Sequence, residues 1–96
     1  MGGSTFMLEA SGKNAQEAFN AAVTQARYES GHGGYSGTIA EKSSYVFIPL
    51  PKGEKAQVYA DELIDVGDPR IDDKWGPAGC ISLGEGRYLF FGWASC

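Results

Sequence analysis

The glycine-rich segment Gly31–Thr38, with the sequence GHGGYSGT, combines residue types that can contact a ligand. Its glycines permit unusual backbone dihedrals and close approach of the backbone to a bound group, and successive N–H groups in such a segment can form an anion-binding nest. Phosphate-binding loops, however, lead from a strand into the N-terminus of a helix. This segment instead follows a predicted helix, whose C-terminal partial negative charge repels phosphate.

We therefore expect the segment to be either a loop that binds a ligand or partner, or a purely structural crossover. The candidate binding residues in and after it are His32, Gly33, Gly34, Tyr35, Ser36, Thr38 and Lys42.

The single histidine of the chain, His32, lies in this segment and is the residue type most often used as a general base. Paired with Ser36 or Cys80 as nucleophile, it would define a small hydrolase or transferase. Neither pair has a supporting motif, because there is no G-x-S-x-G elbow and no family signature around Cys80. We expect no catalytic residue, and we expect His32 to hydrogen-bond or to touch a ligand. The adjacent Asp72 and Asp73 match no calcium loop, so we also predict no metal and no cofactor.

A second candidate surface is the acidic stretch that ends at Trp75. Its six acidic residues are offset only by Arg70 and Lys74, which suits a solvated helix face and loop or an acidic patch that meets a basic partner. Trp75 is either a plug over the end of the core, which we favour, or an exposed anchor for a partner. Its candidate binding residues are Asp72, Asp73 and Trp75. The acidic residues of the stretch are Asp61, Glu62, Asp65, Asp68, Asp72 and Asp73.

The overall charge argues against binding to duplex nucleic acid. Twelve acidic residues against eight basic ones give a net charge of −4, and the basic residues are scattered, whereas nucleic-acid binders usually carry a basic patch. No stretch resembles a secretory signal or a membrane span, and the two cysteines do not form a disulfide framework. We expect a cytoplasmic protein with no membrane partner.

The elements that must position these residues fit a single domain over residues 1–96. Ser4–Ala10 alternates loosely and is predicted to be a strand. Apolar residues at helical spacing then begin at Ala15, after an Asn14 cap that forms a capping box with Glu17, and Gly31 ends this helix.

The rest of the chain predicts further strands around a second helix, with Gly67-Asp68-Pro69 ending that helix and the aromatic last strand at the centre of the sheet. The order β-α-β(β)-α-β-β predicts an α+β fold: a single two-layer domain with a mainly antiparallel sheet of four to five strands and two helices on one face. The expected extended segments are Thr38–Glu41, Tyr45–Leu50, Cys80–Leu83 and Arg87–Ala94, and the expected second helix is Glu54–Val66.

The segments GHGGYSGTIAEK (Gly31–Lys42) and DKWGPAGC (Asp73–Cys80), with the helix AQEAFNAAV (Ala15–Val23), resemble small uncharacterised proteins of phages and mobile elements. The resemblance spans much of the domain but carries no established activity, so it transfers no catalytic residue. It implies a context in the host-cell cytoplasm, since small accessory phage proteins often bind and disable a host defence component. Some occupy the defence complex itself, as anti-CRISPR proteins do, and others sequester a nucleotide immune signal.

We therefore predict a small non-enzymatic binding protein of the anti-defence type, by one of two mechanisms. In the first, the acidic 61–73 region and Trp75 contact a basic surface on a host defence protein. In the second, Gly31–Thr38 and Lys42 cradle a small phosphorylated or nucleotide-like ligand. Ninety-six residues seldom enclose such a ligand alone, so the second mechanism predicts a homo-oligomer. The alternatives are the small enzyme described above and a structural accessory protein.

Overall fold

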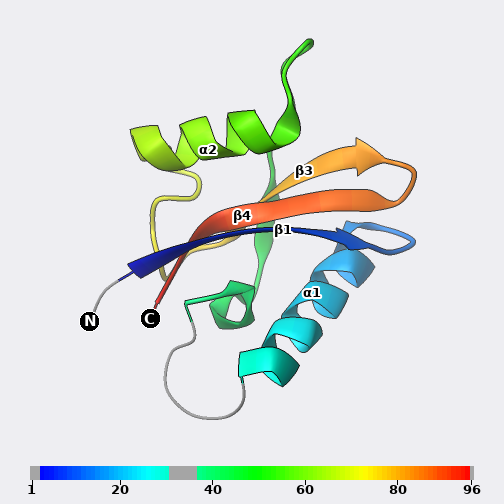
Figure 1. Ribbon diagram of the computed structural model, residues 1–96, viewed down its shortest axis with the longest axis vertical. Helices are drawn as coiled ribbons and strands as arrows, with labels where there is room; N and C mark the ends of the chain where they lie inside the picture. The colour runs from blue at the N-terminus through cyan, green and yellow to red at the C-terminus, as the bar shows by residue number, and fades with distance from the viewer. Residues whose placement is uncertain (1–2, 31–36, 96) are drawn as a thin grey trace.

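A four-stranded mixed sheet lies between two helices in the computed structural model, which describes residues 3–30 and 37–95 (Figure 1). The strands lie in the order β1-β4-β3-β2, with β1/β4 and β4/β3 antiparallel and β3/β2 parallel. The α+β class and the central position of the last strand are confirmed. The elements are β1 (Gly3–Ser11), α1 (Ala15–Ser30), the 3₁₀ helix η1 (Ile39–Glu41), β2 (Tyr45–Phe47), α2 (Ala56–Val66), β3 (Ala78–Gly84) and β4 (Arg87–Ser95).

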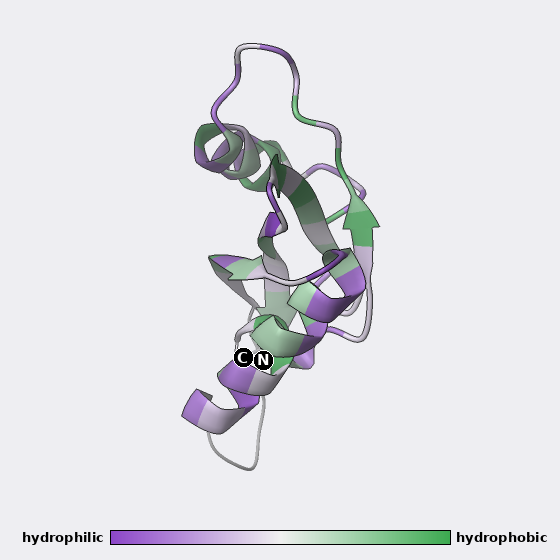
Figure 2. Ribbon diagram, turned by 90° about the vertical axis from the view of Figure 1, so that its right-hand side faces the viewer, coloured by the Kyte–Doolittle hydropathy of each residue, from purple (hydrophilic) through white to green (hydrophobic). Residues whose placement is uncertain are grey.

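The two helices cover opposite faces of the sheet, so the prediction of two layers with both helices on one face is wrong. Phe90 of β4 packs in a core cluster with α1, whereas its neighbours Leu89 and Phe91 pack in a second cluster with α2. Side chains alternate between the two faces of a strand. An uninterrupted apolar run in a central strand therefore requires cover on both faces. Figure 2 shows apolar residues along the strands between the helices.

The start of α1 has the predicted Asn14 cap, but the return bond expected for the capping box goes to Lys13 instead of Asn14. The Asn14 side chain accepts a hydrogen bond from the backbone N–H of Glu17 at 2.9 Å, which satisfies one of the unpaired donors of the first turn. The Glu17 carboxylate reaches back to the N–H of Lys13 at 3.3 Å. From this start, α1 buries a stripe of small residues and Phe19 against the sheet.

The end of α2 is fixed by Gly67, which adopts a left-handed conformation with φ of 68°. Its N–H bonds to the carbonyl of Ile64, and the N–H of Asp68 bonds to that of Leu63, as expected for a glycine-terminated helix. The predicted end at Gly67-Asp68-Pro69 is confirmed, and the helix begins two residues after the predicted Glu54.

The segment after residues 31–36 differs from its prediction. Thr38–Glu41 was expected to be extended, but Ile39–Glu41 forms η1. The Thr38 hydroxyl accepts a hydrogen bond from the N–H of Ala40 at 3.2 Å, and a threonine that bonds its own nearby backbone favours such a turn over a strand. Ile39 is buried, and this short helix thus packs against the core cluster that α1 covers.

Candidate functional site

The loop between α2 and β3, residues 67–77, is held to η1 by one buried lysine. The Nζ atom of Lys42 donates to three backbone carbonyls of this loop: to Asp73 at 3.3 Å, Lys74 at 3.2 Å and Gly76 at 2.8 Å. An ammonium group has three donors and no acceptor. These three bonds therefore match its full donor capacity.

Burial of Lys42 is costly. The residue is only 3% exposed, and removal of a cation from water disfavours its charged form. Desolvation lowers the pKa of Lys42 below its ordinary value, and the nearby Asp73 carboxylate partly opposes this effect. Lys42 thus stabilises the conformation of the loop. Because its ammonium already donates to three carbonyls, it is poorly placed for the predicted role of binding a phosphorylated ligand.

Internal hydrogen bonds fix the same loop locally. The Asp73 carboxylate accepts from the N–H of Trp75 at 2.9 Å, and the Asp73 carbonyl accepts from the N–H of Gly76 at 2.9 Å. Ile71, which is 1% exposed, anchors the preceding part of the loop in the α2 core. The loop is therefore a turn fixed by hydrogen bonds. Asp73 accepts two of these bonds and also carries a negative charge.

Trp75 lies at the outside of this turn. It is 58% exposed, and the Lys74 ammonium lies 5.6 Å from the centroid of its ring. The structure therefore gives Trp75 the exposed position rather than the plug over the core that we favoured. An exposed tryptophan on a turn whose backbone is fixed is suited to anchoring a partner, because little backbone freedom is lost on binding.

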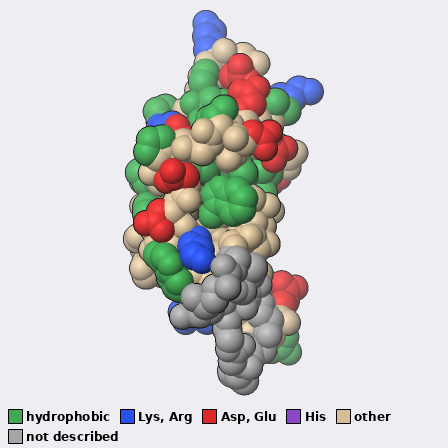
Figure 3. Space-filling model, turned by 90° about the vertical axis from the view of Figure 1, so that its left-hand side faces the viewer, with side chains coloured by type: hydrophobic (Ala, Val, Ile, Leu, Met, Phe, Trp, Pro, Cys, Tyr) green, Lys and Arg blue, Asp and Glu red, His purple; other side chains and the backbone are tan. Residues whose placement is uncertain are grey.

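The loop that carries Trp75 and the preceding helix α2 both bear exposed acidic residues, although the ammonium beside the Trp75 ring is that of Lys74. Asp72 and Asp73 in the loop are exposed, as are Asp61, Glu62 and Asp65 on α2. Acidic side chains recur between hydrophobic ones on the face that carries the end of α2 (Figure 3). Asp68 differs from the others, because it forms an ion pair with Arg70 at 2.9 Å and also accepts from the N–H of that residue.

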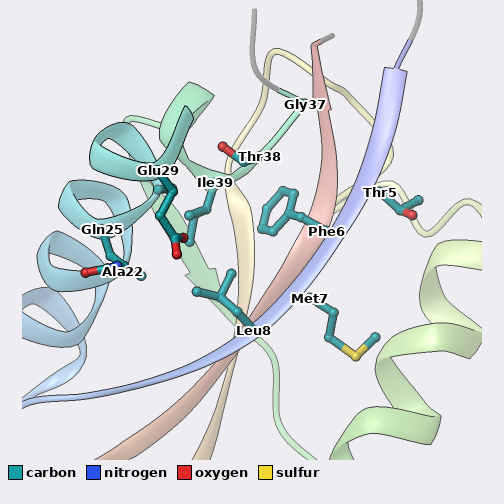
Figure 4. Close-up of a pocket in the computed structure, with 11 residues that line it drawn as sticks. Thr5, Phe6, Met7, Leu8, Ala22, Gln25, Glu29, Gly37, Thr38 and Ile39 are labelled. Atoms are coloured by element: carbon teal, nitrogen blue, oxygen red, sulfur yellow. The ribbon is translucent and has the colours of Figure 1, made fainter. Parts of the chain in front are cut away.

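Thr38 lies elsewhere, at a groove between α1 and β1 of about 510 Å³ (Figure 4). Of its described lining residues, Glu29 is the one that carries a charge, and a carboxylate repels phosphate. The groove thus gives an anionic ligand no cationic side chain from the described part of the chain. Its lining residues are Thr5, Phe6, Met7, Leu8, Ala22, Gln25, Ala26, Glu29, Gly37, Thr38 and Ile39.

The predicted site residues are therefore divided. The structure brings Lys42, Asp73 and Trp75 together with Asp72, and it places Thr38 at the separate groove. His32, Gly33, Gly34, Tyr35 and Ser36 lie outside the described residues, so the predictions for them stay predictions. The role of Lys42 in holding the loop was missed, because its partners are more than thirty residues away in sequence and are backbone carbonyls, which leave no side-chain signal.

Cys80 is unsuited to nucleophilic catalysis. It is fully buried in the α1 core, and burial raises the pKa of its thiol to about 11. Only the thiolate is a strong nucleophile, so the enzyme alternative that uses Cys80 has neither access nor ionisation in its favour. Over residues 3–30 and 37–95, no cluster of metal-ligating side chains is found.

Comparison of the chain with protein-family models, curated proteins and solved structures finds no significant match in any of the three. Within the described residues, neither helix has the length and apolar character needed to cross a bilayer. The resemblance to small phage proteins stays a hypothesis about the context of the chain.

Proposed function

We propose that this chain is a non-enzymatic binding protein that docks on a basic protein surface through Trp75 and the acidic residues around it. The observation that carries the proposal is the three-carbonyl contact of buried Lys42 with the loop that presents Trp75. Removal of a cation from water, as in this contact, costs free energy. A loop fixed in this way loses little conformational freedom when it binds a partner.

The charge of the surface sets the kind of partner. The exposed acidic groups of the loop and of α2 suit a protein surface rich in Lys and Arg, since complementary charge steers association and rejects other partners. Surfaces that bind nucleic acid have this character. A host defence complex that handles nucleic acid is therefore the class of partner we propose, and the anti-defence context itself rests on the resemblance of the Gly31–Lys42 and Asp73–Cys80 segments to phage proteins.

The nucleotide-binding mechanism receives less support from the described residues. The Lys42 ammonium is bonded to carbonyls, and the groove beside Thr38 carries a carboxylate, that of Glu29. We therefore expect a panel of nucleotides to leave the melting temperature unchanged. A rise of several degrees with one of them would favour the nucleotide mechanism, because a ligand that binds only the folded state stabilises it.

The proposed docking surface is tested by quantitative affinity purification from host cells that express a tagged chain. Trp75→Ala should remove the captured partner, because it deletes the central anchor, and Asp72→Lys should weaken capture and reduce its dependence on salt. Tyr28→Ala is the matched control, since Tyr28 is an aromatic residue with 86% exposure on α1. A capture profile that is the same for Trp75→Ala and Tyr28→Ala would reject the proposal.

A further inference from the structure

Among the residues that the structure describes, the strand β1 lies at an edge of the sheet and is paired along its whole length on one side only. Its nine residues pair with β4 from Gly3 opposite Ser95 to Ser11 opposite Arg87. In an antiparallel pair, alternate residues of a strand direct their N–H and C=O groups away from the partner. β1 thus presents a row of backbone donors and acceptors at its outer edge.

The two edges of the sheet differ in how they limit further pairing. β2 spans three residues and is followed closely by Pro49 and Pro51, and shortness and proline both hinder the addition of a strand. β1 has nine residues, no proline and no lysine, and one charged residue, Glu9. It therefore lacks the shortness, proline and lysine that commonly protect an edge.

The groove of about 510 Å³ opens along this edge of β1. Four consecutive residues, Thr5–Leu8, line it, although consecutive side chains of a strand point to opposite faces. Figure 4 shows Phe6 and Leu8 directed toward α1, whereas Thr5 and Met7 point to the other side. A groove that contacts all four residues runs beside the backbone of the strand, with α1 as its second wall.

The lining side chains and the charge of the groove indicate which kind of ligand it can bind. On α1 it is lined by the small side chains of Ala22 and Ala26, with Gln25 and Glu29 beside them. Ala22 and Ala26 are buried at the base of this wall, whereas Gln25 and Glu29 are exposed. Glu29 is the one charged residue among the described lining residues and favours a basic side chain.

We propose that this groove binds an extended peptide segment, which adds as a strand beside β1 and places a Lys or Arg side chain near Glu29. The backbone of the segment bonds to the outer edge of β1, and its side chains on the α1 side rest against the exposed Gln25 and Glu29. This mode of recognition combines main-chain hydrogen bonds for affinity with side-chain contacts for specificity. The inference is independent of the Trp75 surface.

A second copy of the chain fits this edge less well than a single peptide strand. Pairing of β1 with its own copy would place the two strands about 4.8 Å apart. Each β1 carries α1 beside it, and two packed helices need about 8–10 Å between their axes. A lone segment brings no helix with it and avoids this conflict.

Selection from a displayed library of random nine-residue peptides tests the groove. Wild-type protein should enrich peptides with Lys or Arg, and Gln25→Trp, which fills the groove from an exposed position, should weaken their binding at least tenfold. Ala21→Trp is the matched control, because Ala21 is exposed on α1 and is not among the described lining residues. Glu29→Lys should shift the selected peptides toward Asp and Glu. Equal binding to wild type and Gln25→Trp, or no enrichment at all, would overturn the proposal.

Hydrogen-exchange NMR with one selected peptide tests strand addition itself. The peptide should slow exchange at alternate amides of Thr5–Glu9, and N-methylation of the peptide should abolish binding at every second position only. Unchanged exchange in β1, or equal tolerance of N-methylation at all positions, would contradict strand pairing. Protection of the same amides by rising protein concentration alone would show that a second copy covers this edge, and would also overturn the proposal.

Discussion

At the scale of single residues, Lys42 explains how an exposed loop is held in one conformation. Its three bonds join η1 to carbonyls of the α2–β3 loop, and those carbonyls would lose their donor if the ammonium were removed. Lys42→Met should therefore lower the free energy of unfolding by about 2 kcal/mol, as expected when buried polar groups lose a charged partner. Urea unfolding measures this change, and Lys52→Met, at an exposed lysine, is the control. Equal losses for the two variants would show that Lys42 does not hold the loop.

Burial lowers the reactivity of the Cys80 thiol. Because its pKa is raised to about 11, only about one thiol in a thousand is ionised at pH 8. Iodoacetamide should leave Cys80 unmodified in the folded protein and should label it in denaturant, and peptide mapping can read it separately from Cys96. Rapid labelling of Cys80 under native conditions would restore it as a candidate nucleophile.

The Asp68–Arg70 pair gives the loop a small dependence on pH. Hydrogen bonds from Arg70 hold the pKa of Asp68 below its ordinary value, so the charged carboxylate is favoured in the folded state. Its contribution is present above the unfolded pKa of about 4 and is lost as pH falls through the lower folded pKa. The Arg70 side chain is 41% exposed, which limits the contribution to about 0.5–1 kcal/mol.

Asp68→Asn should therefore lower stability at pH 7, and the difference from wild type should shrink as the pH is lowered toward 2. The amide keeps an oxygen that can accept from the N–H of Arg70, so the variant isolates the charge. Chemical unfolding at both pH values measures the effect. A difference that is the same at pH 7 and pH 2 would mean that the carboxylate charge contributes nothing.

At the scale of elements, the contact between β3 and β4 depends on the absence of a side chain at Gly79. A Cβ atom at this position would lie 2.6 Å from Cζ of Phe91 and 3.0 Å from a methyl of Ile71. Gly79→Ala should lower the free energy of unfolding by about 1–3 kcal/mol, because a packed core must shift to admit the methyl group. Gly3→Ala is the control, since its nearest contact is 3.4 Å. Equal thermal unfolding of the two variants would contradict this packing.

The sequence predicted the elements whose signals are local. The Asn14 cap and the Gly67 terminus depend on hydrogen bonds within a few residues, and the apolar run Leu89–Phe91 placed β4 at the centre of the sheet. The same run implied cover on both faces, and this consequence was missed. The position of Lys42 depends on contacts with a distant loop, which no local pattern of residue types reports.

At the scale of the whole molecule, a thin sheet with a helix on each face presents two separate surfaces. The molecule measures 40 × 31 × 17 Å. Figure 1 looks along its shortest dimension and shows the strands between α1 and α2. One surface carries Trp75 and exposed acids of the α2–β3 loop, and the other is the groove along the β1 edge. We propose that each of these two surfaces binds a partner, and the described residues place them on different elements of the fold.

The most direct test of the proposed function places a photo-cross-linking amino acid at position 75. If the loop is the docking surface, irradiation in host cells should join the chain to a protein with a basic surface, and raised salt should weaken that product. The same cross-linker at position 28, on the exposed outer side of α1, should not form this product. Identical cross-linked products from positions 75 and 28, or none at 75, would contradict the account.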